Sequence, residues 1–407
     1  MTSATRVNHQ HPIPVSPPNA RNNLIRLTLA QAFAGANSVV VYTIGAIVGN
    51  LLAPNQLLAT LPVSVFVVGM ALCALPAGWL TRRQGRRTTF LVGTGCGVLA
   101  GLLSALAMVK GAFWLYCCAT FLGGAYAAVV LSFRFAAADC VAPAKRSQAL
   151  SIVMAGGILA GIIGPQLVSL TMGKLAHYPF AATFLAQAAV AAVSAVMLAG
   201  VRLPPTSLEQ GDGGRPIRLI ARDPGFIAAV TCGVVSYLLM NFLMTAAPLA
   251  MRFCGLPQDA ANLGIQWHVI AMYAPSFFTG KWIARFGAKR IVAIGLLLTG
   301  LSAAIGLTGV DVLHFWLTLI LLGLGWNLAF IGASSLVLQC HQPAEKAKVQ
   351  SFNDFIVFGM VAVGSLISGG LLTSYGWQTV LWLSFIPLSL AGLALAVFSV
   401  RQRAFTA

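Results

Sequence analysis

Acidic side chains are scarce in this sequence, and charge of either sign is uncommon. Charged residues make up 8% of the 407 positions, with 25 lysines and arginines against eight aspartates and glutamates. A soluble domain carries roughly a quarter charged residues. Because 58% of this chain is hydrophobic, its apolar surface cannot all be hidden from water. The composition excludes an ordinary soluble protein and indicates that lipid surrounds the chain.

Motifs for catalysis, metal binding and nucleic-acid binding are missing as well. The eight cysteines form no C-x-x-C pair and no His/Cys set at metal spacing. A phosphate-binding G-x-x-x-x-G-K-[ST] loop does not occur. The net charge of +17 is not gathered into a basic stripe with interleaved aromatic residues. We therefore expect a protein that is not an enzyme and that has no metal, no cofactor and no nucleic-acid partner.

Long apolar runs are what the sequence does contain. About 20 apolar residues cross a bilayer core as a helix, and these runs lack the alternation of a membrane β-barrel. Twelve spans are expected, at residues 24–49, 58–80, 88–108, 112–137, 146–170, 179–201, 225–251, 261–283, 291–309, 312–339, 351–374 and 377–400.

Lysines and arginines predict the orientation of these spans. One set of loops and both termini hold most of them, whereas the opposite side has Lys110, Lys174 and Arg252. The positive-inside rule then places both termini in the cytoplasm of a protein of the bacterial inner membrane. The expected segments are a disordered tail 1–23, a six-helix bundle 24–201, a cytoplasmic linker 202–224, a second bundle 225–400 and a tail 401–407.

Two short phrases occur twice, about 200 residues apart. They are Gly78-x-x-x-x-Arg83-x-Gly85-x-Arg87 with Gly280-x-x-x-x-Arg285-x-Gly287-x-Lys289, and Pro143-Ala144-x-Arg146-x-x-x-x-Ser151 with Pro343-Ala344-x-Lys346-x-x-x-x-Ser351. The duplication indicates two related halves in tandem. In a membrane protein, such repeats are typical of two bundles that move about a shared substrate site.

With these repeated loops, the chain resembles the major facilitator superfamily. The resemblance covers residues 24–400 and implies an all-α integral membrane protein with twelve transmembrane helices in two pseudo-symmetric six-helix bundles. It also implies a secondary active transporter that moves a small-molecule substrate across the lipid bilayer by alternating access. We expect the transporter to be monomeric.

The loop phrase departs from the family pattern at its acidic position, where Arg82 and Ala284 stand. In relatives, that carboxylate helps to hold the cytoplasmic ends of the two halves together. Asp354 is expected at the start of the eleventh span, which in this fold approaches the first loop. We therefore expect a reversed cytoplasmic latch in which Arg82 or Arg83 pairs with Asp354. The alternative is that these charges are unpaired and solvated.

Signatures of the proton-exchanging branch are incomplete. Ala119 and Thr120 stand where that branch has an arginine, and its proline-glycine phrase is only partly present around Pro165. Other phrases resemble a proteobacterial permease branch that includes riboflavin-uptake proteins: Ser132-Phe133-Arg134-Phe135, Gly323-Leu324-Gly325-Trp326-Asn327 and Gln350-Ser351-Phe352-Asn353-Asp354-Phe355. The resemblance favours uptake, and a proton-coupled metabolite or drug exporter is the alternative.

Polar and aromatic residues at mid-span depth are the candidate substrate-binding residues. In the fold that the resemblance implies, spans one, four, seven and ten line a central cavity. Asn37, Tyr126, Asn241, Trp326 and Asn327 fall near the middle of these spans. The alternative for each asparagine is a helix–helix hydrogen bond, and for each aromatic residue ordinary packing.

The centre of every expected span lacks a carboxylate. Such a group costs about 2.5–3.5 kcal/mol and is kept only for function. Its absence argues against a cationic substrate and favours a neutral, planar, hydrogen-bonding solute, such as riboflavin.

Two further residues are candidates for coupling or gating. Arg134 lies in the cytoplasmic third of span four, where the alternatives are snorkelling or a pair with Asp139. His268, in the outer third of span eight, is a candidate proton carrier, and the alternative is a neutral, hydrogen-bonded histidine. A receptor or scaffold derived from a transporter is the rival from another functional class.

Overall fold

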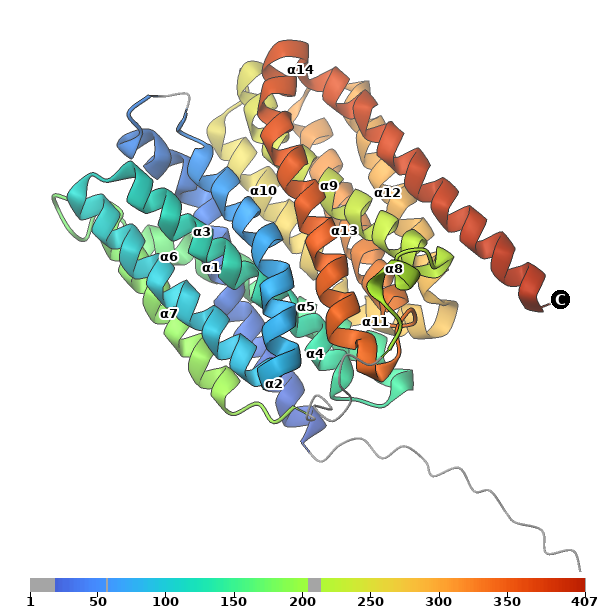
Figure 1. Cartoon of the computed structure of the whole chain (residues 1–407). Helices are drawn as coiled ribbons and strands as arrows, with labels where there is room; N and C mark the ends of the chain where they lie inside the picture. The colour runs from blue at the N-terminus through green and yellow to red at the C-terminus, as the bar shows by residue number, and fades with distance from the viewer. Residues whose placement is uncertain (1–18, 56–57, 204–213, 407) are drawn as a thin grey trace, which may run out of the picture.

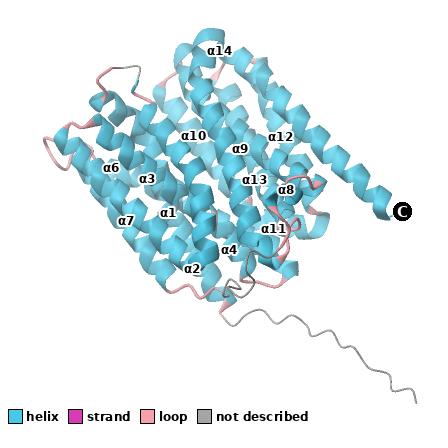
Figure 2. Cartoon of the chain, viewed as in Figure 1, coloured by secondary structure: helices cyan, strands magenta, loops and turns pink. Residues whose placement is uncertain are grey.

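The computed structural model describes residues 19–55, 58–203 and 214–406, and for residues 258, 366–370, 373 and 401–406 only the backbone. Helices joined by short loops make up this part of the chain, and no strand occurs in it (Figure 2). Among the described residues, nine helical stretches are long and apolar enough to cross a membrane. The expectation of an all-α membrane protein is confirmed.

Each half of the chain supplies seven labelled helices (Figure 1). The first half contains α1 (Ala20–Leu52), α2 (Leu61–Lys110), α3 (Phe113–Leu131), α4 (Phe133–Asp139), α5 (Arg146–Ala155), α6 (Gly157–Thr171) and α7 (Ala181–Ala199). The second contains α8 (Ile217–Ile220), α9 (Pro224–Phe253), α10 (Gln258–Tyr273), α11 (Ser276–Phe286), α12 (Ala288–Thr308), α13 (Val312–Val337) and α14 (Lys346–Thr406).

Three glycines mark turns between consecutive spans. Gly85 (φ 84°) breaks α2, Gly376 (φ 77°) breaks α14, and Gly287 (φ 85°) separates α11 from α12. Glycine adopts a left-handed φ at little cost because it has no Cβ. With α3–α4, α5–α6 and α10–α11 counted as interrupted spans, the described residues form the twelve expected spans.

The turns richest in lysine and arginine lie at one end of the bundle, which we call the basic end. It comprises the turns around 82–87, 145–146, 289–290 and 346–348, and it is the lower end in Figure 1. α1 begins at this end. The two halves stand side by side, and the main contacts between them join α2 to α14, α5 to α11 and α6 to α10.

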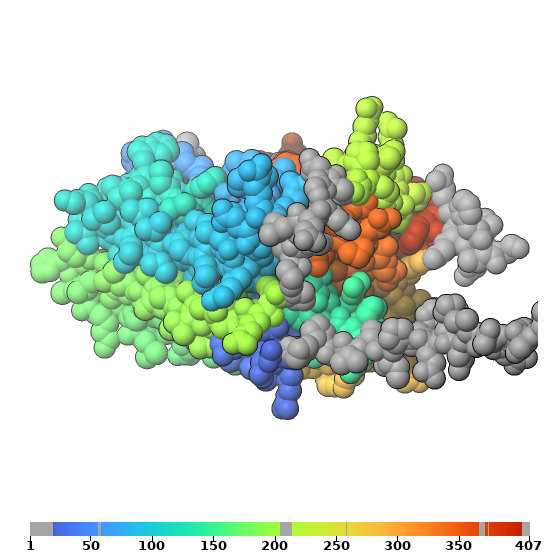
Figure 3. All heavy atoms as spheres, turned by 60° about the horizontal axis from the view of Figure 1, so that its bottom comes forward, coloured from blue at the N-terminus to red at the C-terminus, as the bar shows by residue number. Residues whose placement is uncertain are grey.

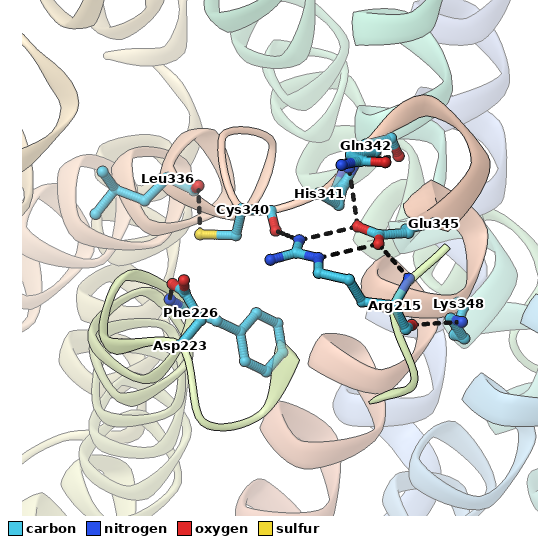
Figure 4. Close-up of polar contacts among 9 residues, drawn as sticks. All are labelled: Arg215, Asp223, Phe226, Leu336, Cys340, His341, Gln342, Glu345 and Lys348. Carbon is cyan, nitrogen blue, oxygen red and sulfur yellow. Dashed lines mark hydrogen bonds and ion pairs between the residues drawn. The ribbon is translucent and has the colours of Figure 1, made fainter. Parts of the chain in front are cut away.

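The described end of the linker is clasped to the second half (Figure 4). The backbone N and Nε of Arg215 donate to Glu345 Oε1 at 2.7 and 3.0 Å, and Nη2 donates to Oε2 at 2.9 Å. Gln342 N donates to Oε2 of the same buried carboxylate at 3.0 Å. Lys348 Nζ donates to the carbonyl of Arg215 at 2.9 Å. These bonds hold the segment that leads into α9 against the turn before α14.

The outermost helices extend beyond their expected limits. Of the expected tails and linker, residues 1–18, 204–213 and 407 lie outside the described residues. Where the chain is described, α1 begins at Ala20 and α14 continues to Thr406.

Candidate functional site

The repeated phrases meet one another across the interface between the halves. A Cβ added to Gly78 on α2 would overlap the side chain of Ser351 on α14. The equivalent pair is Gly280 on α11 with Ser151 on α5: Gly280 N donates to Ser151 Oγ at 3.1 Å, and Ser151 Oγ donates to the carbonyl of Ser276. The close approach of these helices therefore requires glycine at both positions.

A polar network closes the basic end between the halves. Arg86 donates to Asp139 Oδ2 from Nε and Nη2 at 3.0 and 2.8 Å, and from Nη2 to Gln350 Oε1 at 2.7 Å. Lys346 Nζ lies 3.4 Å from the same carboxylate oxygen. Since Arg86 and Asp139 belong to the first half and the other two to the second, this network joins the two bundles. Arg86 was not among the residues expected to join the halves.

A buried ion pair between Arg134 and Asp354 lies deeper in the interface. Arg134 Nη2 is 2.5 Å from Asp354 Oδ1, and Nε donates to Ser334 Oγ at 3.2 Å. Arg134 is fully buried and Asp354 is 4% exposed. The expected latch is corrected here: Asp354 pairs with Arg134, whereas Arg82 and Arg83 are exposed. The expected alternative of an Arg134–Asp139 pair is not formed either.

An aromatic cluster lies next to this pair. Trp326 and Phe330 stack at 5.2 Å with an interplanar angle of 15°. Tyr237 meets Trp326, Phe330 and Phe358 edge-on at 5.7, 5.2 and 5.7 Å. The Arg134 guanidinium stands 4.9 Å from the centre of the Phe330 ring, which connects the cluster to the ion pair.

Three tyrosines, one from the first half and two from the second, border this cluster. Tyr273, at the end of α10, packs edge-on against Trp326 at 5.7 Å, and its ring covers Gly157 of the first half. Tyr42 on α1 packs edge-on against Phe66 at 5.6 Å and borders the same hydrophobic core as Tyr237 and Tyr273. All three tyrosines are only partly buried. The Nε1 of Trp326 is buried without an acceptor among the described residues. The cluster thus combines aromatic rings, hydroxyl groups and a donor without an acceptor, which suit a planar solute, and its tyrosines are the members that remain partly accessible.

Other residues expected to bind substrate face elsewhere. The ring of Tyr126 packs over Gly97 within the first half. Asn37 is buried, and its Nδ2 lies 3.4 Å from the carbonyl of Phe33. Its backbone carbonyl accepts from Gln187 on α7 at 3.4 Å, whereas its Oδ1 has no partner among the described residues. The structure therefore does not bring Tyr126 and Asn37 to the aromatic cluster.

Asn327 binds the broken span formed by α10 and α11. Its Nδ2 donates to the carbonyl of Met272 and to Ser276 Oγ, both at 2.6 Å, and its Oδ1 accepts from Thr279 Oγ1 at 2.6 Å. These bonds use both N–H groups of the amide and one acceptor position of its oxygen. Asn241, one turn after Tyr237 on α9, is buried.

His268 is fully buried against α13. Its Nδ1 lies 2.7 Å from the carbonyl of Leu319, so this nitrogen carries a proton and donates it. Its Nε2 has no partner among the described residues. This arrangement resembles the neutral, hydrogen-bonded histidine that was the alternative to a proton carrier.

Comparison with known proteins accounts for this architecture. The family model of the Major Facilitator Superfamily matches residues 27–261 and 230–406. The chain belongs to the major facilitator superfamily. It is therefore a multi-pass membrane protein of a transporter family, as its repeated phrases predicted.

Two relatives match nearly the whole chain. The riboflavin transporter RfnT of Brucella anthropi is 47% identical over 369 residues, which cover 90% of this chain and 93% of that protein. The uncharacterised transporter YdeG of Bacillus subtilis is 31% identical over 404 residues, with coverage of 93% and 91%.

Solved structures share the fold at low sequence identity. The proton:xylose symporter XylE has a TM-score of 0.75 at 14% identity, covering 93% of this chain and 95% of its own. The fucose:proton symporter FucP of E. coli has a TM-score of 0.71 at 15% identity, covering 93% and 98%. The human organic anion transporter MFSD10 has a TM-score of 0.74 at 17% identity, covering 93% and 100%.

Proposed function

We propose that this protein is a secondary active transporter that takes up riboflavin, a neutral aromatic nutrient, across the bacterial inner membrane. The observation that carries the substrate is the 47% identity with the riboflavin transporter RfnT over 90% of the chain. The aromatic cluster supports it. Riboflavin has an uncharged planar ring system and a polyol chain, which suit ring faces and hydroxyl donors.

The substrate would lie against Trp326, with the tyrosines around it. Stacking on the indole orients the ring system, and the unpartnered Nε1 donates to one of its carbonyl or nitrogen acceptors. The hydroxyls of Tyr42, Tyr237 and Tyr273 donate to or accept from the polar edge. Because Tyr42 belongs to the first half and the others to the second, the bound solute would contact both moving bundles.

The structure corresponds to one state of an alternating-access cycle. The hydrogen bonds between the halves that are described above lie toward the basic end, from Arg134–Asp354 to Arg86–Gln350. The positive-inside rule supports a cytoplasmic location for this end and for both termini. In that orientation the contacts described here hold the cytoplasmic side closed. Release into the cell then requires these contacts to open.

Uptake by intact cells tests the proposal. A bacterial strain that cannot make riboflavin is transformed with the chain and supplied with labelled riboflavin at low concentration. We expect saturable uptake that unlabelled riboflavin suppresses and xylose does not. Efflux from preloaded inverted vesicles, without uptake by cells, would instead identify an exporter. Binding without flux in either direction would identify a receptor.

A further inference from the structure

A polar cavity of about 430 Å³ lies at the basic end of the first half, apart from the aromatic cluster. It is surrounded by the start of α1, the start of the α2 segment after Gly85, and the end of α7. In Figure 3 the blue start of α1 and the green end of α7 adjoin on this face. The cavity is lined by Asn19, Asn22, Asn23, Arg26, Arg87, Ala199, Gly200 and Arg202.

Hydrogen bonds fix two walls of this cavity. Asn23 Nδ2 donates to the carbonyl of Arg202 at 2.7 Å, and Arg202 N donates back to Asn23 Oδ1 at 3.0 Å. The Arg26 guanidinium lies against Gly200, where a Cβ would overlap it. The start of α1 and the end of α7 are therefore held together, and the cavity keeps its shape without a ligand.

Three arginines line the cavity, and none of its lining residues is acidic. The described carboxylates are engaged or placed elsewhere: Asp139 with Arg86 and Lys346, Glu345 with Arg215, Asp354 with Arg134, Asp223 at the start of α9, Asp259 at the start of α10 and Asp311 before α13. Clustered positive charge raises the free energy of the folded state unless an anion accompanies it. The first turn of α1 has no acidic residue, and it adds backbone N–H groups that have no partner in the part of the chain that the structure describes.

Exposed apolar side chains continue from the cavity toward the middle of the bundle. Leu29 follows Arg26 by three positions and Leu91 follows Arg87 by four, so each shares a helix face with an arginine. Val196 precedes Gly200 by four positions on α7. These three side chains are 38%, 37% and 65% exposed. A cationic cavity bordered by exposed apolar surface matches an amphiphile with an anionic head group.

We infer that this cavity binds the phosphate group of an anionic phospholipid, with the acyl chains along Leu29, Leu91 and Val196. Guanidinium groups form paired, charge-assisted hydrogen bonds with phosphate oxygens, and the asparagine amides supply further donors. Free phosphate shares this head-group chemistry, but it makes no use of the apolar border. The bound lipid stabilises the joint between α1 and α7.

Thermal unfolding of the purified full-length protein in detergent tests the site. The probes are short-chain phosphatidylglycerol, zwitterionic phosphatidylcholine and inorganic phosphate. The variants are Arg87→Gln, whose side chain is exposed, and the double variant Arg26→Gln/Arg202→Gln. Arg290→Gln is the matched control, because it removes an exposed basic charge at the same end of the other half.

Phosphatidylglycerol is expected to raise the melting temperature of the wild type and of Arg290→Gln far more than phosphatidylcholine does. Its apparent affinity should fall about fivefold for each cavity arginine removed. A shift by inorganic phosphate with the same arginine dependence supports a phosphate site and overturns the lipid assignment. Equal phosphatidylglycerol shifts in wild type, Arg87→Gln and the double variant overturn the site altogether.

Discussion

Gly78 packs directly against the side chain of Ser351, and the duplicated pair Gly280 and Ser151 repeats this contact on the other side of the interface. Each glycine opens one repeated phrase, and each serine closes the other. One phrase thus supplies the glycine and the other the serine of the same type of contact, which occurs twice between the halves. This explains why both recur in each half at the same spacing.

The first prediction concerns this contact. Gly78→Ala should lower riboflavin uptake about tenfold at equal membrane abundance, because overpacking costs about 1–3 kcal/mol and acts only on the state closed at the basic end. Adding Ser351→Gly removes the overlapping side chain and should restore uptake. Gly95→Ala is the control, since a Cβ there meets nothing within 4 Å. Failure of Ser351→Gly to rescue would contradict this assignment.

The second prediction concerns the buried ion pair. Arg134→Gln or Asp354→Asn alone leaves one charge buried and unpaired, which costs about 3–5 kcal/mol. The double variant should be more stable than either single variant, as thermal unfolding in detergent will show. Arg83→Gln, at an exposed position, should change little. If Arg83→Gln lost as much stability as the Arg134 or Asp354 single variants, the expected latch between Arg83 and Asp354 would be supported instead.

The third prediction addresses substrate recognition. Trp326→Ala should weaken riboflavin binding about 10- to 100-fold, in line with the free energy of aromatic stacking. Trp326→Phe keeps a ring but loses the N–H donor, so we expect a loss of about fivefold. Trp382→Ala, at a 64% exposed position, is the control. Calorimetric titration measures all three, and unchanged binding in Trp326→Ala would place the substrate elsewhere.

The helix on which a residue lies was predictable from the sequence, but the direction of its side chain was not. Asn37 and Tyr126 lie on the expected helices, yet they face neighbours within the first half. Local sequence determines how far along a span a residue lies. The packing of helices from distant segments determines which neighbours its side chain faces. Phe330, one turn after Trp326, could have been found from that spacing.

The partner of Asp354 was missed for a related reason. Arg134 is 220 positions away in sequence, and the two meet only because the halves close at the basic end. Loop arginines were expected as the partners of Asp354 because the family's latch lies in the loop. In this chain the loop's inter-half contact is made by Arg86 instead, three positions after Arg83. Conversely, the duplication, the spans and the glycine turns at Gly85 and Gly287 could be predicted, because each is recorded in contiguous residues.

The fourth prediction concerns pH and the linker clasp. Hydrogen bonds from Arg215 lower the pKa of Glu345 from 4.5 to about 2, against the opposing effect of burial. A lowered pKa means that the clasp contributes stability above pH 4.5, and that this contribution is lost as the pH falls toward 2. The melting temperature of the wild type should fall across this range.

Two variants isolate the role of Glu345. Glu345→Gln should lower stability at neutral pH and flatten the dependence between pH 4.5 and 2, because the titrating group is gone. Asp311→Asn, whose side chain is 87% exposed, should keep the wild-type profile. If the melting temperature of Glu345→Gln fell between pH 4.5 and 2 as steeply as that of the wild type, another group would be responsible for the pH dependence. Arg215→Ala leaves the buried carboxylate short of donors and should cost about 1–3 kcal/mol.

The fifth prediction separates support from recognition at Asn327. The carbonyl of Met272 lies at the break between α10 and α11, where no bond to it from Ser276 N is described. Asn327 supplies a donor to it while also bonding Ser276 and Thr279. Asn327→Ala should therefore destabilise the protein by about 1–3 kcal/mol, yet leave the riboflavin affinity of the folded fraction within about twofold. Ser384→Ala is the control, because that buried hydroxyl bonds only within its own helix among the described contacts.

Stability and affinity measured on the same sample decide between the two roles of Asn327. A residue that touches substrate changes affinity more than melting temperature, as expected for Trp326→Ala. A residue that holds a broken helix changes melting temperature and leaves affinity alone, because Tyr273, at the end of α10, returns to the cluster whenever the span is folded. A large loss of affinity in Asn327→Ala without destabilisation would place its amide in contact with riboflavin.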